Sequence, residues 1–223
     1  GFNMSYTALL RKKADSLWEK EYLHPFVQGI GSGTLELEKF QHYMKQDYLF
    51  LIEFSKVISL AIAKCKNLED MGWFSALLNE TLNTEMSLHV SFCKDFDIGE
   101  KELLDTKMSP ATHSYTRHLL EIGYSGSTPE IATAILPCSW GYSEIGKRLF
   151  ARGLPSNSPL YSRWIEMYNS DEFEDLAIWI RQFIDREVQN MTPSSQEDLE
   201  NIFFTSSKYE YRFWDSAYNL ETW

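Results

Sequence analysis

The sequence lacks long apolar runs and has few cysteines. No run of apolar residues approaches the roughly 18 that a membrane-spanning helix needs, so we expect no association with a membrane. Cys65, Cys93 and Cys138 are odd in number and widely spaced, with no CxxC pair. They do not form a disulfide framework. Together with the absence of a signal-peptide pattern, they predict a cytoplasmic protein.

Basic residues are also in the minority. The chain has 21 Lys and Arg against 32 Asp and Glu, for a net charge of −11, and no basic stripe offsets this balance. A polyanion such as DNA is therefore repelled, and no nucleic-acid partner is expected. The glycine cluster at 29–33 does not match GxGxxG and follows no strand, so it is predicted to be a plain loop and not a phosphate-binding turn.

Strand-like alternation of apolar and polar residues is absent as well, and the periodicity is helical throughout. With 43% hydrophobic residues the chain can bury a large core, and no linker or repeat divides it. We predict an all-α, single-domain protein over residues 4–223, with residues 1–3 read as an expression remnant ahead of Met4. The predicted helices cover residues 5–22, 35–65, 70–96, 110–123, 129–152, 159–168, 171–190 and 195–219.

Several helix starts are marked by a hydroxyl residue next to a proline. A Ser or Thr cap accepts a hydrogen bond from the first helical turn, and proline fits the first helical position because it has no N–H to satisfy. Two further spacings predict capping boxes. The pairs are Ser109-Pro110, Thr128-Pro129, Ser158-Pro159 and Thr192-Pro193, and the boxes are Ser127 with Glu130 and Ser194 with Glu197.

Two carboxylates interrupt otherwise apolar helix faces. Asp47 is the charged residue on the apolar stripe of residues 40–61, and Glu210 has the same position on the stripe of residues 199–217. A buried carboxylate costs stability unless it is paired or hydrogen-bonded. A structural polar contact would explain one such residue, whereas two on separate helices indicate one shared polar pocket.

Glu85 and His89 are a third exception, four residues apart on an apolar face. A metal pair is one interpretation. Carboxylate-bridged metal sites in helical bundles, however, use Glu-x-x-His at a spacing of three, twice, and this sequence has a single pair at a spacing of four. We therefore favour a hydrogen-bonded pair that supports other site residues, and we predict no metal and no other cofactor.

Cys138 follows Pro137 inside a helical pattern. The proline removes one backbone hydrogen bond and displaces the carbonyl of Thr133, and Tyr142 lies one turn after the cysteine on the same face. A helical cysteine is most often an inert core residue, which is how we read Cys65 and Cys93. The proline and the two inward carboxylates favour a reactive thiol at Cys138, in an aromatic pocket suited to a flat, nitrogen-rich ring.

Six segments closely resemble the thiaminase II (TenA) family, in order and over nearly the whole chain. They are HPFVQGIG at 24–31, QDYLFL at 46–51, PATHSYT at 110–116, LPCSWGY at 136–142, WIEMY at 164–168 and EYRFW at 210–214. The resemblance implies a haem-oxygenase-like helical bundle without haem, usually a homotetramer. It also implies hydrolysis of 4-amino-5-aminomethyl-2-methylpyrimidine, and of thiamine, at the exocyclic methylene to give hydroxymethylpyrimidine for thiamine salvage. The LPCSWGY segment places the chain in the family's cysteine-containing branch.

The resemblance also implies roles for individual residues. Cys138 adds to the pyrimidine ring beside the carbon that bears the methylene, Glu210 protonates a ring nitrogen, and Asp47 accepts hydrogen bonds from the 4-amino side. Tyr142 is expected to orient or activate the thiol. Tyr115 and Tyr168 line the pocket, and Phe50 and Phe213 sandwich the ring. Many relatives have tyrosine where this chain has Phe50, so one polar contact is lost here.

Two other functions remain open at this point. A haem- or metal-dependent enzyme could use the same bundle, because fold does not dictate chemistry. The possible ligands are His24, His42, His89, His113 and His118. A non-enzymatic regulatory protein is the second alternative, since relatives have carried a transcription-enhancing label, although the acidic charge argues against direct contact with DNA.

Overall fold

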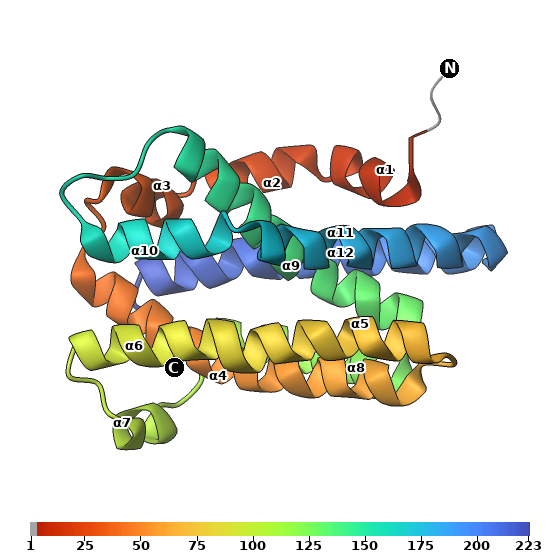
Figure 1. Cartoon of the computed structure of the whole chain (residues 1–223), viewed down its shortest axis with the longest axis horizontal. Helices are drawn as coiled ribbons and strands as arrows, with labels where there is room; N and C mark the ends of the chain where they lie inside the picture. Colours follow the sequence, from red (N-terminus) through yellow and green to blue (C-terminus); the bar gives the residue numbers. More distant parts are fainter. Residues whose placement is uncertain (1–3) are drawn as a thin grey trace.

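The computed structural model describes residues 4–223, where the regular elements are helices and no strand occurs (Figure 1). The all-α prediction is therefore confirmed. Residues 1–3, which we read as an expression remnant, lie outside the described residues, and the domain limits at 4 and 223 stay a prediction. None of the helices in the described part of the chain is long and apolar enough to cross a membrane.

The helices agree closely with the predicted segments, with two additions and two interruptions. Their bounds are α1 Tyr6–Lys13, α2 Asp15–Tyr22, α3 Pro25–Ser32, α4 Leu37–Lys64, α5 Leu68–Asn79, α6 Met86–Asp95, α7 Glu100–Asp105, α8 Pro110–Ser125, α9 Thr128–Ala151, α10 Pro159–Tyr168, α11 Asp171–Glu187 and α12 Pro193–Tyr218. A π-helical turn, Glu80–Glu85, joins α5 to α6, and a 3-10 turn, Val188–Asn190, follows α11.

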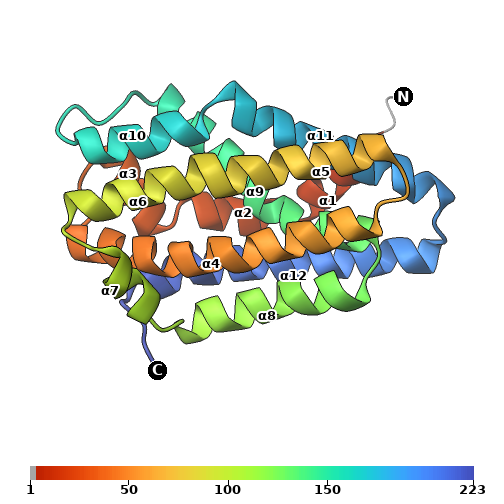
Figure 2. The ribbon, with the colours of Figure 1, turned by 60° about the horizontal axis from the view of Figure 1, so that its bottom comes forward.

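The long helices run along the long axis of the molecule (Figure 2). α4 packs against α8 and α5, α9 packs against α10 and α11, and α12 contacts α4, α8, α9 and α2. Both figures show α5 and α6 in line, forming one rod beside α4. Three long helices, α4, α9 and α12, therefore enclose the centre of the bundle, and the rod closes it from the side.

Side-chain caps fix most helix starts as predicted. Ser109, Ser158 and Thr192 each accept a hydrogen bond from the backbone of the first turn of their helix. Two expectations were wrong. α9 is capped by Ser127 and not by Thr128, because Ser127 forms the predicted capping box with Glu130 and so places Thr128 inside the helix. At α12, the cap Thr192 pairs with the N–H of Ser195, so Ser194 lies within the helix and does not cap it.

The glycine cluster predicted to be a loop is mostly helical. α3 covers Pro25–Ser32, and it ends at Gly33, whose φ of 75° suits glycine. Glycine lowers helix propensity, but Phe26, Val27 and Ile30 are completely buried, and tertiary packing outweighs that preference. The predicted helix at 5–22 is likewise two helices, α1 and α2, because the backbone turns at Ala14 (φ −92°, ψ 6°).

Candidate active site

Five of the predicted polar residues lie buried in the centre of the bundle. Asp47 comes from α4, Cys138 from α9, Glu210 from α12, Glu85 from the π-helical turn and His89 from α6. The three carboxyl residues and the thiol are each at most 9% exposed, and His89 is fully buried. Residues far apart in the sequence therefore meet in one buried cluster.

The Cys138 thiol and the Glu210 carboxyl lie close enough together to shift each other's pKa. Burial raises the pKa of Cys138 well above its usual value, and the charges of Glu210, Glu85 and Asp47 raise it further. The resting sulfur is therefore a protonated thiol at neutral pH. Proton transfer to a neighbouring base is needed before it becomes a strong nucleophile.

Glu210 is suited to exchange that proton. Burial raises its pKa to about 7, although hydrogen bonds from Tyr115 and Cys138 act in the opposite direction. The Tyr115 hydroxyl donates to Oε1 of Glu210 at 2.6 Å and fixes the orientation of the carboxyl. A carboxyl group with a pKa near neutrality can act as both acid and base, as general catalysis requires.

Asp47 pairs with His89. Nε2 of His89 contacts Oδ2 of Asp47, and Nδ1 of His89 lies 2.8 Å from the backbone carbonyl of Glu85. Because a carbonyl can only accept, Nδ1 carries a proton. Burial alone would lower the pKa of His89, but the charge of Asp47 and the hydrogen bonds to Asp47 and Glu85 raise it overall. The pair is therefore an ion pair with Asp47 held in a fixed orientation.

Glu85 is buried, and within residues 4–223 it has no basic side chain in an ion pair with it. Its carboxyl accepts a hydrogen bond from the Tyr168 hydroxyl at 3.2 Å. Burial and the charge of Asp47 raise the pKa of Glu85 to about 8. The predicted Glu85–His89 pair does form, but through the backbone carbonyl of Glu85 and not through its side chain. The Glu85 carboxyl is thus left to face the site.

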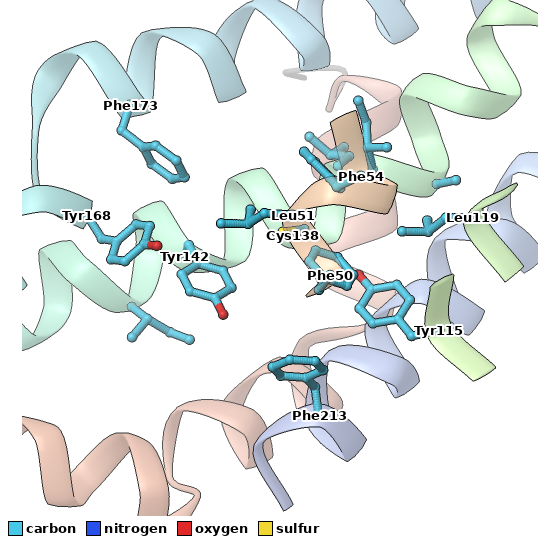
Figure 3. Close-up of a cluster of buried hydrophobic side chains, with 14 of the residues drawn as sticks. Phe50, Leu51, Phe54, Tyr115, Leu119, Cys138, Tyr142, Tyr168, Phe173 and Phe213 are labelled. Atoms are coloured by element: carbon cyan, nitrogen blue, oxygen red, sulfur yellow. The ribbon is translucent and has the colours of Figure 1, made fainter. Parts of the chain in front are cut away.

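Aromatic rings surround the thiol from several helices (Figure 3). Phe50 packs on Tyr115 with ring centroids 4.9 Å apart and on Phe213 at 5.7 Å, whereas Tyr142 packs on Tyr168 at 4.7 Å. In the view of Figure 3, Tyr142 and Tyr168 lie to one side of Cys138, and Phe50 and Tyr115 lie to the other. The predicted binding residues therefore line one aromatic enclosure.

The hydroxyl of Tyr142 is engaged by another tyrosine. It lies 2.8 Å from the hydroxyl of Tyr43, which sequence reasoning had placed only in the core. The group that acts most strongly on the Cys138 thiol besides burial is the Glu210 carboxyl. The Tyr142 hydroxyl is thus engaged with Tyr43, and its link to the thiol is packing one helical turn away.

Glu21 is a buried carboxyl that sequence reasoning missed. It lies at the end of α2, only 3% exposed, and accepts a hydrogen bond from the indole N–H of Trp214 at 3.0 Å. Burial and the charge of Glu210 raise its pKa well above the usual value. Trp214 is one turn after Glu210, so Glu21 fixes α12 next to the Glu210 carboxyl. Its short helix, rich in other charges, gave no apolar stripe on which the residue would stand out.

The other two thiols differ from Cys138. Cys93 is buried in the core as predicted, and burial raises its pKa to about 11. The prediction of a core position for Cys65 was wrong. Cys65 caps the C-terminus of α4, is partly exposed, and lines a surface cavity of about 470 Å³ between α4 and the start of α9.

The histidines do not assemble into a ligand set. Within residues 4–223, no group of three or more His, Cys, Asp and Glu side chains is arranged to hold a metal ion. A haem iron needs an imidazole nitrogen that faces the bundle interior and is free to bind. The two buried histidines have both nitrogens engaged: His24 with the N–H of Phe26 and with Asp215, and His89 with Glu85 and Asp47. Neither of these two histidines therefore offers a free nitrogen to a haem iron.

Similarity to known proteins extends over the whole chain. A sequence model of the TENA/THI-4/PQQC family matches residues 11–220. The chain is 44% identical over 222 residues to the aminopyrimidine aminohydrolase of Halalkalibacterium halodurans, which covers 99% of this chain and 98% of that protein. Among solved structures, it resembles a TenA family transcription regulator from Silicibacter sp., with a TM-score of 0.88, 33% identity and 96% of each chain covered.

A more distant structure bears on the fold alone. A domain of unknown function from Shewanella denitrificans, described as having a heme oxygenase-like fold, matches with a TM-score of 0.76 at 16% identity, over 98% of this chain and 94% of that chain. The predicted haem-oxygenase-like bundle is thereby confirmed.

Proposed function

We propose, because this chain belongs to the TENA/THI-4/PQQC family, that it is an aminopyrimidine aminohydrolase that works through a covalent cysteine adduct. The substrate is 4-amino-5-aminomethyl-2-methylpyrimidine, with thiamine as a second substrate, and the product is hydroxymethylpyrimidine for thiamine salvage. The observation that carries the proposal is the buried Cys138–Glu210 pair inside the aromatic enclosure.

The enclosure fits a flat pyrimidine. Phe50 and Phe213, whose ring centroids lie 5.7 Å apart here, would separate to take the ring between them, and Tyr115 and Tyr168 would close the edges, so that stacking adds to the hydrogen bonds that hold the ring. The Asp47 carboxylate, oriented by His89, accepts from the 4-amino group, and the Glu210 carboxyl binds the ring nitrogen beside the carbon that is attacked. Cys138 would lie next to that nitrogen, because its thiol is close enough to Glu210 for the carboxyl to shift its pKa.

Glu210 both accepts and supplies the proton that the addition transfers. The sulfur of Cys138 bonds to the ring carbon, the thiol proton passes to Glu210, and Glu210 gives a proton to the ring nitrogen. The electron pair of the 4-amino group then expels ammonia from the methylene and leaves an exocyclic double bond. Asp47 assists because its charge favours electron release from the amino group. Water adds to the methylene, its oxygen bonds to the methylene carbon, and its surplus proton leaves with the released ammonia as ammonium. The ring nitrogen then returns its proton to Glu210, the carbon–sulfur bond breaks, and Glu210 passes that proton to the departing sulfur.

The direct test is an assay of ammonia release from the aminomethyl pyrimidine, run beside cleavage of thiamine. We expect turnover with the pyrimidine and loss of turnover in Glu210→Gln and Asp47→Asn, with the fold retained as judged by circular dichroism. Both amides keep the size of the side chain but remove its charge. Wild-type rates in both variants would show that the carboxyls are structural.

A regulatory function is the alternative, since the similar Silicibacter protein is described as a transcription regulator. The buried thiol and carboxyl favour catalysis, because a protein that only bound a partner would have no use for a proton-exchanging group in its buried centre. Binding of a pyrimidine without ammonia release would favour regulation.

We further propose that the enzyme is a homotetramer in the cytoplasm, with the pyrimidine as its partner and with no cofactor. The tetramer rests on the family resemblance. Light scattering at micromolar concentration is expected to give about four times the 26.1 kDa of one chain, and a monomer mass would contradict the proposal.

A further inference from the structure

The π-helical turn Glu80–Glu85 delivers a carboxyl whose role is unexplained. π-helical turns inside α-helices occur often at functional sites, because the extra residue redirects the side chains that follow. This one ends at Glu85, next to the site. Glu85 is only 8% exposed and its carboxyl accepts from Tyr168, yet among residues 4–223 no Lys, Arg or His pairs with it. Burying an unpaired carboxyl is costly unless a ligand compensates it.

The order of atoms in the ring indicates what Glu85 faces. The methylene-bearing carbon has two ring neighbours: the carbon attacked by Cys138 and the carbon carrying the amino group bound by Asp47. The methylene therefore projects between Asp47 and Cys138. Glu85 lies beside this region, because its backbone carbonyl and the Asp47 carboxyl contact the same imidazole of His89, and its carboxyl accepts from Tyr168, which packs on Tyr142 one turn after Cys138.

The group on that methylene is positively charged. An alkylamine carries a proton at neutral pH, as a lysine side chain does, and a thiazolium carries a permanent charge. Asp47 is already balanced by His89, and Glu210 is engaged with Tyr115 and the thiol. Among these carboxyls, Glu85 is the one left to balance a cation.

We propose that Glu85 binds the cationic group on the exocyclic methylene and thereby selects pyrimidines with a positively charged leaving group. This assignment rests on the proposed function. Tyr168 positions the carboxyl through its hydroxyl, and His89 fixes the backbone of Glu85 and the side chain of Asp47 together. The product, whose methylene bears a neutral hydroxyl, is held less strongly at this position and is free to leave.

Cation binding is coupled to proton release. Burial and Asp47 raise the pKa of Glu85 to about 8, so at pH 7 the free site holds the proton, and a cation displaces it. Affinity for the aminomethyl pyrimidine therefore rises as the pH is raised from 6 to 8. The titratable groups that face Glu85 are Tyr43 and Asp47 of α4, Glu80 of the π-helical turn, His89 of α6, Cys138 of α9 and Tyr168 of α10.

Titration calorimetry on the Cys138→Ser chain separates binding from turnover. The two ligands are the aminomethyl and hydroxymethyl pyrimidines, which share the ring and differ at the methylene. Glu85→Gln is expected to weaken binding of the aminomethyl compound by at least about tenfold and to change binding of the hydroxymethyl compound by less than about twofold. Glu80→Gln, on the same π-helical turn but only partly buried, is the matched control; its charge is the last of the causes that raise the pKa of Glu85, so it is expected to change binding of either compound by less than about twofold.

Three results would overturn the assignment. Equal loss for both ligands would make Glu85 a structural residue, and no loss for either would remove it from the site. If the Cys138→Ser chain binds neither pyrimidine, the proposed function fails and the assignment fails with it. A second measurement tests the assignment without the Glu85 variant. Calorimetry in two buffers of different ionisation enthalpy reports how many protons are released on binding. We expect proton release with the aminomethyl compound and less release with the hydroxymethyl compound.

Discussion

Buried carboxyl groups at the centre of the molecule avoid accumulating negative charge. Asp47 is paired with His89, whereas burial raises the pKa of Glu85 to about 8 and that of Glu210 to about 7. Burial and the charge of Glu210 raise the pKa of Glu21 well above its usual value and so oppose its ionisation. Two like charges in a low-dielectric interior repel strongly, so each carboxyl either finds a cation or keeps its proton. Near neutral pH the carboxyl groups of the site therefore hold protons in addition to binding the substrate.

Replacing the Cys138 sulfur tests the proposed nucleophile. Cys138→Ser is expected to lower turnover by at least about a hundredfold, because a hydroxyl is a far weaker nucleophile than a thiolate. Binding of the pyrimidine survives, since the rings and carboxyls remain. Steady-state ammonia release and calorimetry measure the two effects separately.

Cys93→Ser is the matched control for that prediction. Cys93 is buried in the core away from the carboxyls, so the serine is expected to affect stability and to leave turnover near that of the wild type. Full activity in Cys138→Ser, or equal losses in both variants, would contradict the cysteine mechanism.

The sequence predicted some site residues and not others for a physical reason. Asp47 and Glu210 stand out because each is the charged member of a long apolar stripe, and both are buried as expected. The hydroxyl of Tyr43 and the carboxyl of Glu21 were missed. A tyrosine on an apolar face looks like any core residue, and Glu21 lies in an eight-residue helix with too few turns to define a stripe.

At the scale of whole elements, helices with strong caps and long periodic stripes were predictable, and short ones were not. α7 has six residues and no side-chain cap, and the sequence around it shows no periodicity. α3 contains two glycines, yet its apolar residues are drawn into the core. The π-helical turn is invisible to periodicity because one extra residue shifts the face of a helix without interrupting its composition.

Close approach of α9 and α10 depends on Gly146. A Cβ at this position would lie 2.5 Å from the backbone carbon of Tyr168, so the end of α10 can reach the site only because α9 has no side chain there. Gly146→Ala is expected to lower the free energy of unfolding by about 1–3 kcal/mol and to reduce turnover by displacing Tyr168. Chemical denaturation and the ammonia assay measure the two effects.

Gly72 provides the matched control. It lies in α5, and no atom lies within 4 Å of the point that the Cβ of an alanine would occupy, so the substitution meets no obstacle. Gly72→Ala is expected to raise the free energy of unfolding by up to about 1 kcal/mol, because alanine has the higher helix propensity, and to leave turnover unchanged. Equal effects of the two substitutions would show that the α9–α10 contact is not tight.

On the scale of the whole molecule, the bundle serves to exclude water from a polar centre. α4, α9, α12 and the rod of α5 and α6 each contribute one or two polar side chains to that centre, and their remaining inward residues are mostly apolar. Exclusion of water strengthens hydrogen bonds to the ring and shifts the carboxyl pKa values toward neutrality. The same burial of carboxyl groups lowers the free energy of unfolding, so the residues that favour activity reduce stability.

That opposition appears in the dependence of stability on pH. Glu85 and Glu210 have folded pKa values of about 8 and about 7, above the 4.5 of an unperturbed glutamate. Below pH 4.5 both are protonated in the folded and unfolded chains, and their contribution to stability is fully present. As the pH rises toward 8, the unfolded chain loses its protons first, so unfolding becomes easier.

The double variant Glu85→Gln/Glu210→Gln cannot titrate there, and its melting temperature is expected to rise relative to the wild type as the pH is raised from about 5 to about 8. Glu38→Gln, at an exposed position of α4, is expected to show no such trend. Differential scanning calorimetry at several pH values measures it, and a constant difference between wild type and double variant across this range would show that these carboxyls are not strained by burial.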